Sequence, residues 1–292
     1  MRKTIGMWAA ALLMLTVLAA CDKHVHDDER GLAVALKWQD ATDEGTTVGD
    51  IRLWIYNEAG HAVGKYHFTE AREVASQLFP LQAGRYTVVG AINLTSPLTS
   101  NAEGSNVERL LFAPDGTGAE LSHAWYGVAQ VTVAAEGISS TEVELRRMLS
   151  ELTINITGAP EGTTLTGRVE GTATGVYPAA KAADGYGQPS ATYSATELPK
   201  TEAHEGRLQI AALPLMPTAA GLSGASMKLQ LTSAEGHVQQ CTLEAPPMEM
   251  AGKYVLDVAY DDLRASMRLS VHTISDWVKG WTIEMEITDP AN

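Results

Sequence analysis

The 292-residue sequence lacks the common signatures of catalysis. It holds no phosphate-binding G-x-x-x-x-G-K-S/T loop and no G-x-G-x-x-G, G-x-S-x-G, H-E-x-x-H or Cys-x-x-Cys pattern. Because no motif supplies a nucleophile, a metal site or a phosphate cradle, a binding or structural role is the default. We therefore predict no enzyme activity, no catalytic residues and no cofactor.

Positive charge is scarce as well, with 21 Lys and Arg residues against 35 Asp and Glu residues and a net charge of −14. Such a surface repels nucleic acid and anionic lipid headgroups, so we predict no nucleic-acid partner. Sustained helical periodicity is also missing, because no stretch after residue 21 keeps a 3.6-residue apolar period for more than about two turns. That absence argues against α/β folds and helix bundles.

The N-terminal residues are typical of a lipoprotein signal peptide. Arg2 and Lys3 precede an apolar run at 5–20, and residues 18–21 read Leu-Ala-Ala-Cys, which matches the bacterial lipobox. A plain secretory signal with a chance cysteine and a transmembrane anchor are the alternatives, but the run is shorter than the roughly 18 to 20 residues of a spanning helix. We predict that residues 1–20 are removed and that Cys21 becomes the lipidated N-terminus.

The second cysteine, Cys241, then has no partner for a disulfide bond, and we interpret it as a small buried hydrophobe.

Residues 21–30 are polar and acidic and form a predicted flexible tether. Acidic residues just after a lipidated cysteine resemble the surface-export signal of Bacteroidetes lipoproteins, which would place the protein on the outer face of the cell. His24 and His26 could hold a metal together with Asp27 or Asp28. A solvated tether is the favoured interpretation, because no fixed scaffold surrounds them.

Alternating apolar and polar residues indicate β-strands from residue 31 onward. The first segment, 32–38, places its apolar residues on one face, and a polar turn at 57–60 joins a predicted hairpin. The alternating segments of this part lie at 32–38, 51–55, 63–68, 86–92, 124–128, 130–134 and 141–145, with one helical turn at 106–112.

A fresh alternating run at 152–156 follows the pair Arg146-Arg147, so we predict domains over 31–146 and 147–292. Residues 172–205 show little periodicity and are interpreted as a surface excursion, either a variable insertion or a binding loop. The other strand segments lie at 165–169, 208–212, 267–271 and 281–287, and a hairpin joins 227–232 to 238–243.

One short motif occurs twice. Ala-Gly-Arg-Tyr at 83–86 and Ala-Gly-Lys-Tyr at 251–254 each follow a proline and precede an alternating strand. A glycine turn with a tyrosine at strand entry recurs in β-sandwiches, where the ring covers the end of the core. The repeat favours an all-β fold of two tandem β-sandwiches, with chance similarity as the alternative.

Two clusters of acidic residues could form a metal or catalytic site, and each has a simpler structural interpretation. Glu202, His204 and Glu205 have the side chains of metal ligands but lie in the irregular segment. The carboxylates at 257, 261 and 262 could hold calcium or act as acid and base, yet Asp257 lies on the outward face of a predicted strand and the other two open a turn. We predict no metal site at either group.

Aromatic side chains could stack on a sugar, but at strand spacing they are more often part of a core. The candidates are Trp54, Trp125, Trp277 and Trp281.

In their order along the chain, these motifs resemble the FimB-like fimbrial anchor and accessory lipoproteins of Bacteroidales, relatives of the fimbrillins. The resemblance implies two transthyretin-like, Greek-key β-sandwich domains and a structural role, without catalysis, at the membrane-proximal base of a fimbria. Its motifs are the lipobox with its acidic tether, the strand at 32–38, Leu-Gln-Ala-Gly-Arg-Tyr at 81–86, Leu-Arg-Arg-Met at 145–148, Gly-Lys-Tyr at 252–254 and Ile-Ser-Asp-Trp at 274–277. The segment 172–205 is longer and less patterned than the family leads us to expect.

The resemblance implies fimbrial subunits as partners, joined by strand addition, and a lipid-anchored place in the outer membrane. A polymerising subunit of this kind loses its first strand to a protease, and the inserted strand of a neighbour then fills the groove. Here Arg30 precedes the first strand and Arg52 lies within the second, so neither cut would open a groove. We expect a base subunit, with a surface lipoprotein that binds glycan or another ligand for outer-membrane uptake as the alternative.

Membrane attachment is expected to depend on Cys21 alone, because no other segment of the mature chain is apolar enough to hold it. Cys21→Ser should leave the protein soluble in the periplasm, measured by fractionation and immunoblotting. Continued partition of the Cys21→Ser protein with the outer membrane after a high-salt wash would contradict the lipid anchor.

Overall fold

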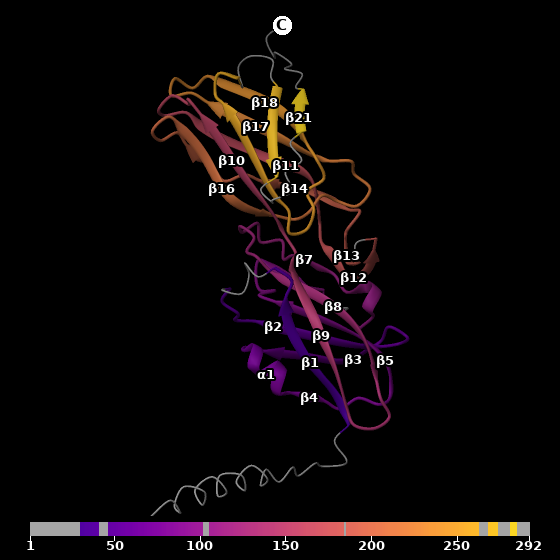
Figure 1. Ribbon diagram of the computed structural model, residues 1–292. Coiled ribbons are helices and arrows are strands. Elements are labelled where there is room, and N and C mark those ends of the chain that lie inside the picture. Colours follow the sequence, from indigo (N-terminus) through magenta and orange to yellow (C-terminus); the bar gives the residue numbers. More distant parts are fainter. Residues whose placement is uncertain are drawn as a thin grey trace, which may run out of the picture.

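The computed structural model describes residues 30–40, 46–101, 105–183 and 185–262, together with the backbone of strands at 268–273 and 281–284. The predicted signal peptide, Cys21, residues 22–29 of the tether and the motif at 274–277 lie outside the described residues. The molecule is elongated, with the N-terminal part of the chain at one end and the C-terminal part at the other (Figure 1). The predicted all-β class is confirmed, since the described residues contain one short α-helix among many strands.

The first half is built on a seven-stranded sheet in the order β3-β2-β5-β8-β9-β1-β4. Neighbouring strands are antiparallel except β1 and β9, which run parallel. A short helix, α1 (Ala71–Ser76), buries Val74 against this sheet. The strands are β1 (Gly31–Trp38), β2 (Ile51–Asn57), β3 (Ala62–Phe68), β4 (Leu78–Phe79), β5 (Gly84–Ile92), β8 (Trp125–Val133) and β9 (Ile138–Arg147).

The sheet curls around an apolar core to which most of its strands contribute. Leu32 and Val34 of β1 are buried, as the alternation of 32–38 predicts. The predicted split into strands at 124–128 and 130–134 is wrong, because β8 runs unbroken through Ala129. The first three residues of β8 are buried, whereas its last residues alternate between more and less exposed positions. In the sequence, this change of pattern resembles the boundary between two strands.

The second strand is also buried on both faces. Trp54 and Tyr56 belong to a second apolar cluster, opposite the core that holds Ile51, Leu53 and Ile55. This cluster is covered by a four-stranded sheet in the order β13-β12-β7-β6 and by the 3₁₀ turn η2 (Val107–Arg109), which was predicted as a helical turn. The strands of this layer are β6 (Leu98–Ser100), β7 (Phe112–Pro114), β12 (Val176–Ala182) and β13 (Gly185–Pro189).

Residues 172–205, interpreted from the sequence as a surface excursion, form four regular strands that belong to two sheets. β12 pairs with β7 at Val176↔Phe112, so this part of the second half completes the covering layer of the first. In Figure 1, β12 and β13 lie beside β7 and β8. The rest forms β14 (Tyr193–Glu197) and β15 (Thr201–Glu202), both paired with β11. Short strands and a register shift conceal the alternation.

The second half is a sandwich of two sheets, in the orders β16-β10-β19-β20-β21 and β14-β11-β17-β18. A single large core lies between them, and Cys241 of β18 packs against it. The predicted hairpin is confirmed by β17 and β18, which pair from Ala225↔Ala245 to Thr232↔Val238. The remaining strands are β10 (Ser150–Thr157), β11 (Thr164–Ala173), β16 (Arg207–Leu215), β17 (Ala225–Thr232), β18 (Val238–Ala245), β19 (Lys253–Ala259), β20 (Arg268–Thr273) and β21 (Trp281–Glu284).

The repeated tyrosine motif makes a similar contact in both halves, since each hydroxyl bonds a backbone carbonyl in the turn before its strand. The hydroxyl of Tyr86 donates to the carbonyl of Gln82 at 2.9 Å, and that of Tyr254 donates to the carbonyl of Pro247 at 3.1 Å. Each ring thus closes the turn before its strand, as in a tyrosine corner. The two strands nevertheless differ in their neighbours, because β5 lies between antiparallel strands whereas β19 runs parallel to β10.

The strand pairing bears on the domain division, which stays a prediction. Along the sequence, β9 is the last strand of the seven-stranded sheet and ends at Arg147, and β10 begins the sandwich at Ser150. Both positions are close to the predicted boundary between 31–146 and 147–292. The contribution of β12 and β13 to the first half shows that the chain crosses back after this point.

Gly127 is expected to be important for stability, because β9 lies close beside β8 at this position. A Cβ at Gly127 would lie 2.1 Å from the carbonyl oxygen of Glu144 and 2.8 Å from Val143 Cγ1, so the two strands would have to move apart. Gly127→Ala should lower the free energy of unfolding by about 1–3 kcal/mol or more, measured by urea denaturation. Gly49→Ala meets no atom within 4 Å and is the control, expected to change stability by less than about 1 kcal/mol. Equal effects of the two substitutions would contradict this account.

Tyr254→Phe should destabilise the protein more than Tyr86→Phe. The Tyr254 hydroxyl also accepts from the backbone N–H of Glu249 at 2.7 Å, and the variant leaves that donor unpaired. We expect a loss of about 1–3 kcal/mol for Tyr254→Phe and about 0.5–1.5 kcal/mol for Tyr86→Phe. Burial raises the pKa of Tyr254 above its ordinary 10.0, so stability should fall as pH rises past 10.0, and less so in Tyr254→Phe. A larger loss in Tyr86→Phe would refute the ranking.

Candidate functional site

The first strand of the chain is held on both sides. β1 pairs with β9 from Gly31↔Ile138 to Trp38↔Leu145, and its beginning pairs with β4. Trp38 meets Trp125 edge to face, with ring centroids 5.7 Å apart. Burial of Leu32 and Val34 contributes on the order of 1.5–3 kcal/mol each. β1 is therefore an integral core strand, and the place that it fills is closed to a strand from another molecule.

The two arginines nearest to this strand differ in accessibility. Arg30 is exposed and directly precedes β1. Arg52 lies in β2 between β3 and β5, and its Nε donates to Asp50 Oδ2 at 3.1 Å. Proteases cut exposed segments in preference to paired strands. A cut after Arg30 leaves β1 in its place, and a cut after Arg52 would require β2 to leave the sheet.

An ion-pair cluster centred on Glu151 joins the two halves. Glu151 Oε1 lies 2.9 Å from His123 Nε2 and 3.1 Å from Arg147 Nη1. Its other oxygen, Oε2, lies 3.7 Å from Lys253 Nζ. His123 precedes β8 and Arg147 ends β9, whereas Glu151 and Lys253 belong to the paired strands β10 and β19. The Glu151 side chain is 17% exposed, so solvent screens these charges less than it would on an open surface.

Arg146 forms the second contact between the halves. Its guanidinium donates to the hydroxyl of Tyr126, at 3.1 Å from Nε and 2.8 Å from Nη2, and to the carbonyl of Tyr186 in β13. The same hydroxyl lies 3.2 Å from Met250 Sδ in the loop before β19. Gly187 permits this approach, because a Cβ there would lie 1.7 Å from the Tyr126 oxygen. These contacts hold two segments of the second half against one face of the first.

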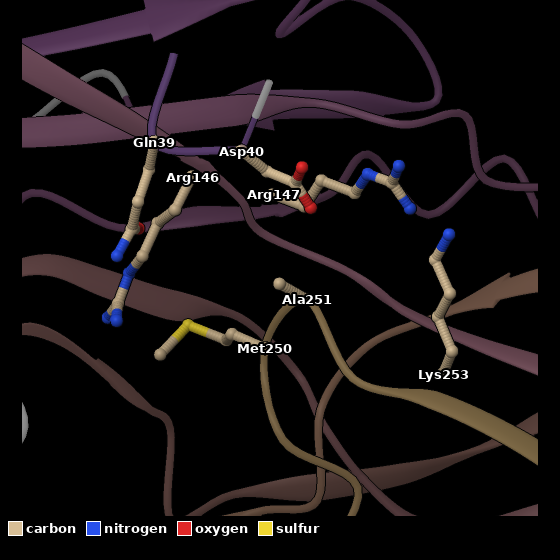
Figure 2. Close-up of a pocket in the computed structure, with 7 residues that line it drawn as sticks. All are labelled: Gln39, Asp40, Arg146, Arg147, Met250, Ala251 and Lys253. Carbon is tan, nitrogen blue, oxygen red and sulfur yellow. The ribbon is translucent and has the colours of Figure 1, made fainter. Parts of the chain in front are cut away.

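A cavity of about 430 Å³ opens at this junction. Figure 2 shows Gln39 and Arg146 extending toward Met250, with Asp40 and Arg147 side by side and Lys253 on the opposite side. The lining offers carboxylate, guanidinium, ammonium and amide groups but no hydroxyl or thiol side chain that could act as a nucleophile. The lining residues are Gln39, Asp40, Arg146, Arg147, Met250, Ala251 and Lys253.

The acidic groups considered from the sequence lie on the surface of the second half. Glu202, His204 and Glu205 are all exposed. Asp257 accepts a hydrogen bond from Asn155 at 2.6 Å on an exposed strand face. Across the part of the chain that the structure describes, no three His, Cys, Asp or Glu side chains gather as metal ligands.

The aromatic residues behave as predicted where they are described, and Cys241, predicted as buried, is half-buried against the core. Trp54 and Trp125 are 6% exposed and belong to the cores. Burial raises the pKa of the Cys241 thiol to about 11, so the group stays protonated and inert at neutral pH. Cys21, His24, His26 and Trp277, and the side chain of Trp281, lie outside the described residues.

The junction cluster was not found from the sequence. The pair Arg146-Arg147 marks the predicted join, but nothing in its spacing points to His123 or Lys253 as neighbours. A carboxylate four residues after an arginine, as in Arg147 and Glu151, is a recognisable pair only within a helix, and here the two residues lie on successive strands.

Solved structures of similar fold come from Porphyromonas and Bacteroides species. The fimbrial anchor protein Mfa2 from Porphyromonas gingivalis is 15% identical, with a TM-score of 0.52 over 87% of this chain and 99% of that one. A Bacteroides thetaiotaomicron protein described as a candidate polysaccharide-binding protein (DUF1812) is 10% identical, with a TM-score of 0.56 over 88% of this chain and 99% of that one. At these identities the similarity shows the fold alone.

Among curated proteins, no sequence matches the chain. A family model described as Mfa2, fimbrillin-A associated anchor proteins Mfa1 and Mfa2, matches residues 21–285. This match covers both halves of the molecule and agrees with the family that the ordered motifs indicate. Because it spans most of the chain, the protein belongs to the Mfa2 family of fimbrillin-A associated anchor proteins.

Proposed function

We propose that the protein is the lipid-anchored base subunit of a fimbria, with a structural role in assembly and no catalytic step. Family membership supports a fimbrial accessory role. The observation that carries the more specific proposal is the first strand, which is paired with β9 along its whole length and buries Leu32 and Val34. A subunit that keeps this strand has no groove there for the next subunit, so it ends a polymer instead of extending it.

The anchor is the lipid on Cys21, which holds the chain in the outer membrane with the folded part on the cell surface. The sequence at 18–21 supports this part of the proposal. No helix within the described residues is long and apolar enough to cross a membrane. β1 begins at the end of the molecule remote from β18 and β21, so the tether would leave those strands pointing away from the membrane (Figure 1).

The alternative, a glycan-binding lipoprotein of an uptake system, has less support. Sugar binding would need an aromatic platform at the surface. Trp54 and Trp125 are buried, and Tyr193 is the only aromatic residue among the strongly exposed hydrophobic side chains of the described chain.

Intact mass of the protein purified from its native outer membrane tests the base-subunit proposal. We expect a chain that begins at Cys21 with its lipid and retains β1, because membrane attachment depends on Cys21. A chain that begins after Trp38 would show that the protein loses its first strand and polymerises.

A Thr46→Arg variant is the matched control, because it places an arginine in the unpaired segment between β1 and β2. Its cleavage would show that a cut after the first strand is detectable in this preparation. If the variant is cut and the native protein is not, the native protein keeps β1 because of its own sequence and not because the protease is missing.

A further inference from the structure

A second groove, with a volume of about 490 Å³, lies where the second half meets the loop at 114–121. Residues 194–199 form one wall and the loop forms another. Three side chains in its lining are otherwise buried, since Leu198, Leu213 and Met216 are 6%, 4% and 2% exposed. The groove therefore gives access to apolar surface that continues into the cores.

One wall of the groove is a free strand edge. β14 is the last strand of its sheet and pairs with β11 alone. The edge strand of the facing sheet, β16, carries Pro214 in the same groove, and proline has no N–H for a neighbouring strand. Of the two edges that meet here, β14 is the one able to accept another strand.

The main-chain groups of β14 show which residues face this edge. The N–H of Leu198 donates to the carbonyl of Gly167, and the carbonyl of Ser194 accepts from the hydroxyl of Thr172, so both residues turn toward β11. Because successive residues of a strand point their main-chain groups in opposite directions, Ala195 and Glu197 turn away from β11, toward the free edge. In the described structure, no hydrogen bond outside the β11 ladder uses the main-chain groups of these two residues.

The charges of the groove indicate what kind of segment could bind there. Glu120 and Glu197 are its only charged lining residues, and both are acidic. The chain as a whole carries a net charge of −14, which disfavours a second copy as the occupant. A segment with a lysine or arginine beside apolar side chains matches both the charge and the lining.

We infer that this groove receives an extended segment of a fimbrial subunit, which adds a strand to β14. The segment pairs with Ala195 and Glu197 through its main chain, places apolar side chains against Leu198 and Met216 and sets a basic residue near Glu120. This inference rests on the proposed function, because it names the place where the anchor holds its partner.

Binding of designed peptides to the purified Cys21→Ser protein tests the groove directly. The probe is a fluorescent octapeptide that alternates valine and threonine and carries one central lysine, and its counterpart carries glutamate instead. We expect the lysine peptide to bind at least fivefold more tightly, and Ala195→Pro to weaken its binding at least tenfold, because that variant removes an outward N–H. Thermal unfolding monitored by circular dichroism checks that Ala195→Pro is folded.

A charge reversal keeps the test informative if Ala195→Pro does not fold. The double variant Glu120→Lys, Glu197→Lys should prefer the glutamate peptide. The double variant Glu136→Lys, Glu235→Lys makes the same change of net charge in two exposed turns outside the groove and should keep the original preference. An unchanged preference in the groove variant, or equal binding of both peptides by the unmodified groove, would overturn the inference.

Counts of cell-attached and shed fimbriae separate this inference from the proposed function. Deletion of the gene should release fimbriae, and the wild-type gene should restore their attachment. If deletion leaves fimbriae attached, the proposed function is wrong. If deletion releases them but Ala195→Pro restores attachment fully, the base-subunit function stands and the groove is not the docking site.

Discussion

The parallel pairing of β1 with β9 joins strands from opposite ends of the first half. Leu32 and Val34 can be buried only when β9 is in place, so the core of this half closes as a whole. β9 then passes into β10 through Met148 and Leu149, which are both buried. β10 in turn forms a parallel pair with β19. Each half is thus closed by a parallel pair of distant strands, and non-local pairing of this kind slows folding.

Alternation within the chain predicted those strands that have one wet and one buried face. β1 and the hairpin of β17 and β18 are of this type. β2 was also predicted, although both of its faces are buried. Prediction failed where a second layer covers the outer face, as at the beginning of β8, and where pairing partners are far apart in sequence, as for Val176 and Phe112. Apolar and polar residues alternate only weakly over 172–205. The short strands of this segment extend sheets whose other strands come from distant parts of the chain.

The family was recognisable from the order of short motifs, but the geometry of the junction was not. Glu151 draws together His123, Arg147 and Lys253 from three other segments, and no spacing rule connects them. The groove beside β14 likewise depends on the loop at 114–121 and on the end of β16. Such sites arise from the packing of the two halves, which a strand-by-strand pattern does not describe.

The direction of the parallel pair determines how the molecule carries mechanical load. The tether enters at the first residue of β1, whereas the chain leaves the far end of β9 for the second half. In the proposed base subunit, a pull between the membrane and a fimbria would therefore draw two parallel strands past each other along their length. In this shear geometry the hydrogen bonds of the ladder share the force together, whereas a peeling geometry would break them one at a time. In the proposed base subunit, retention of β1 would thus also set the force at which the shaft detaches from the cell.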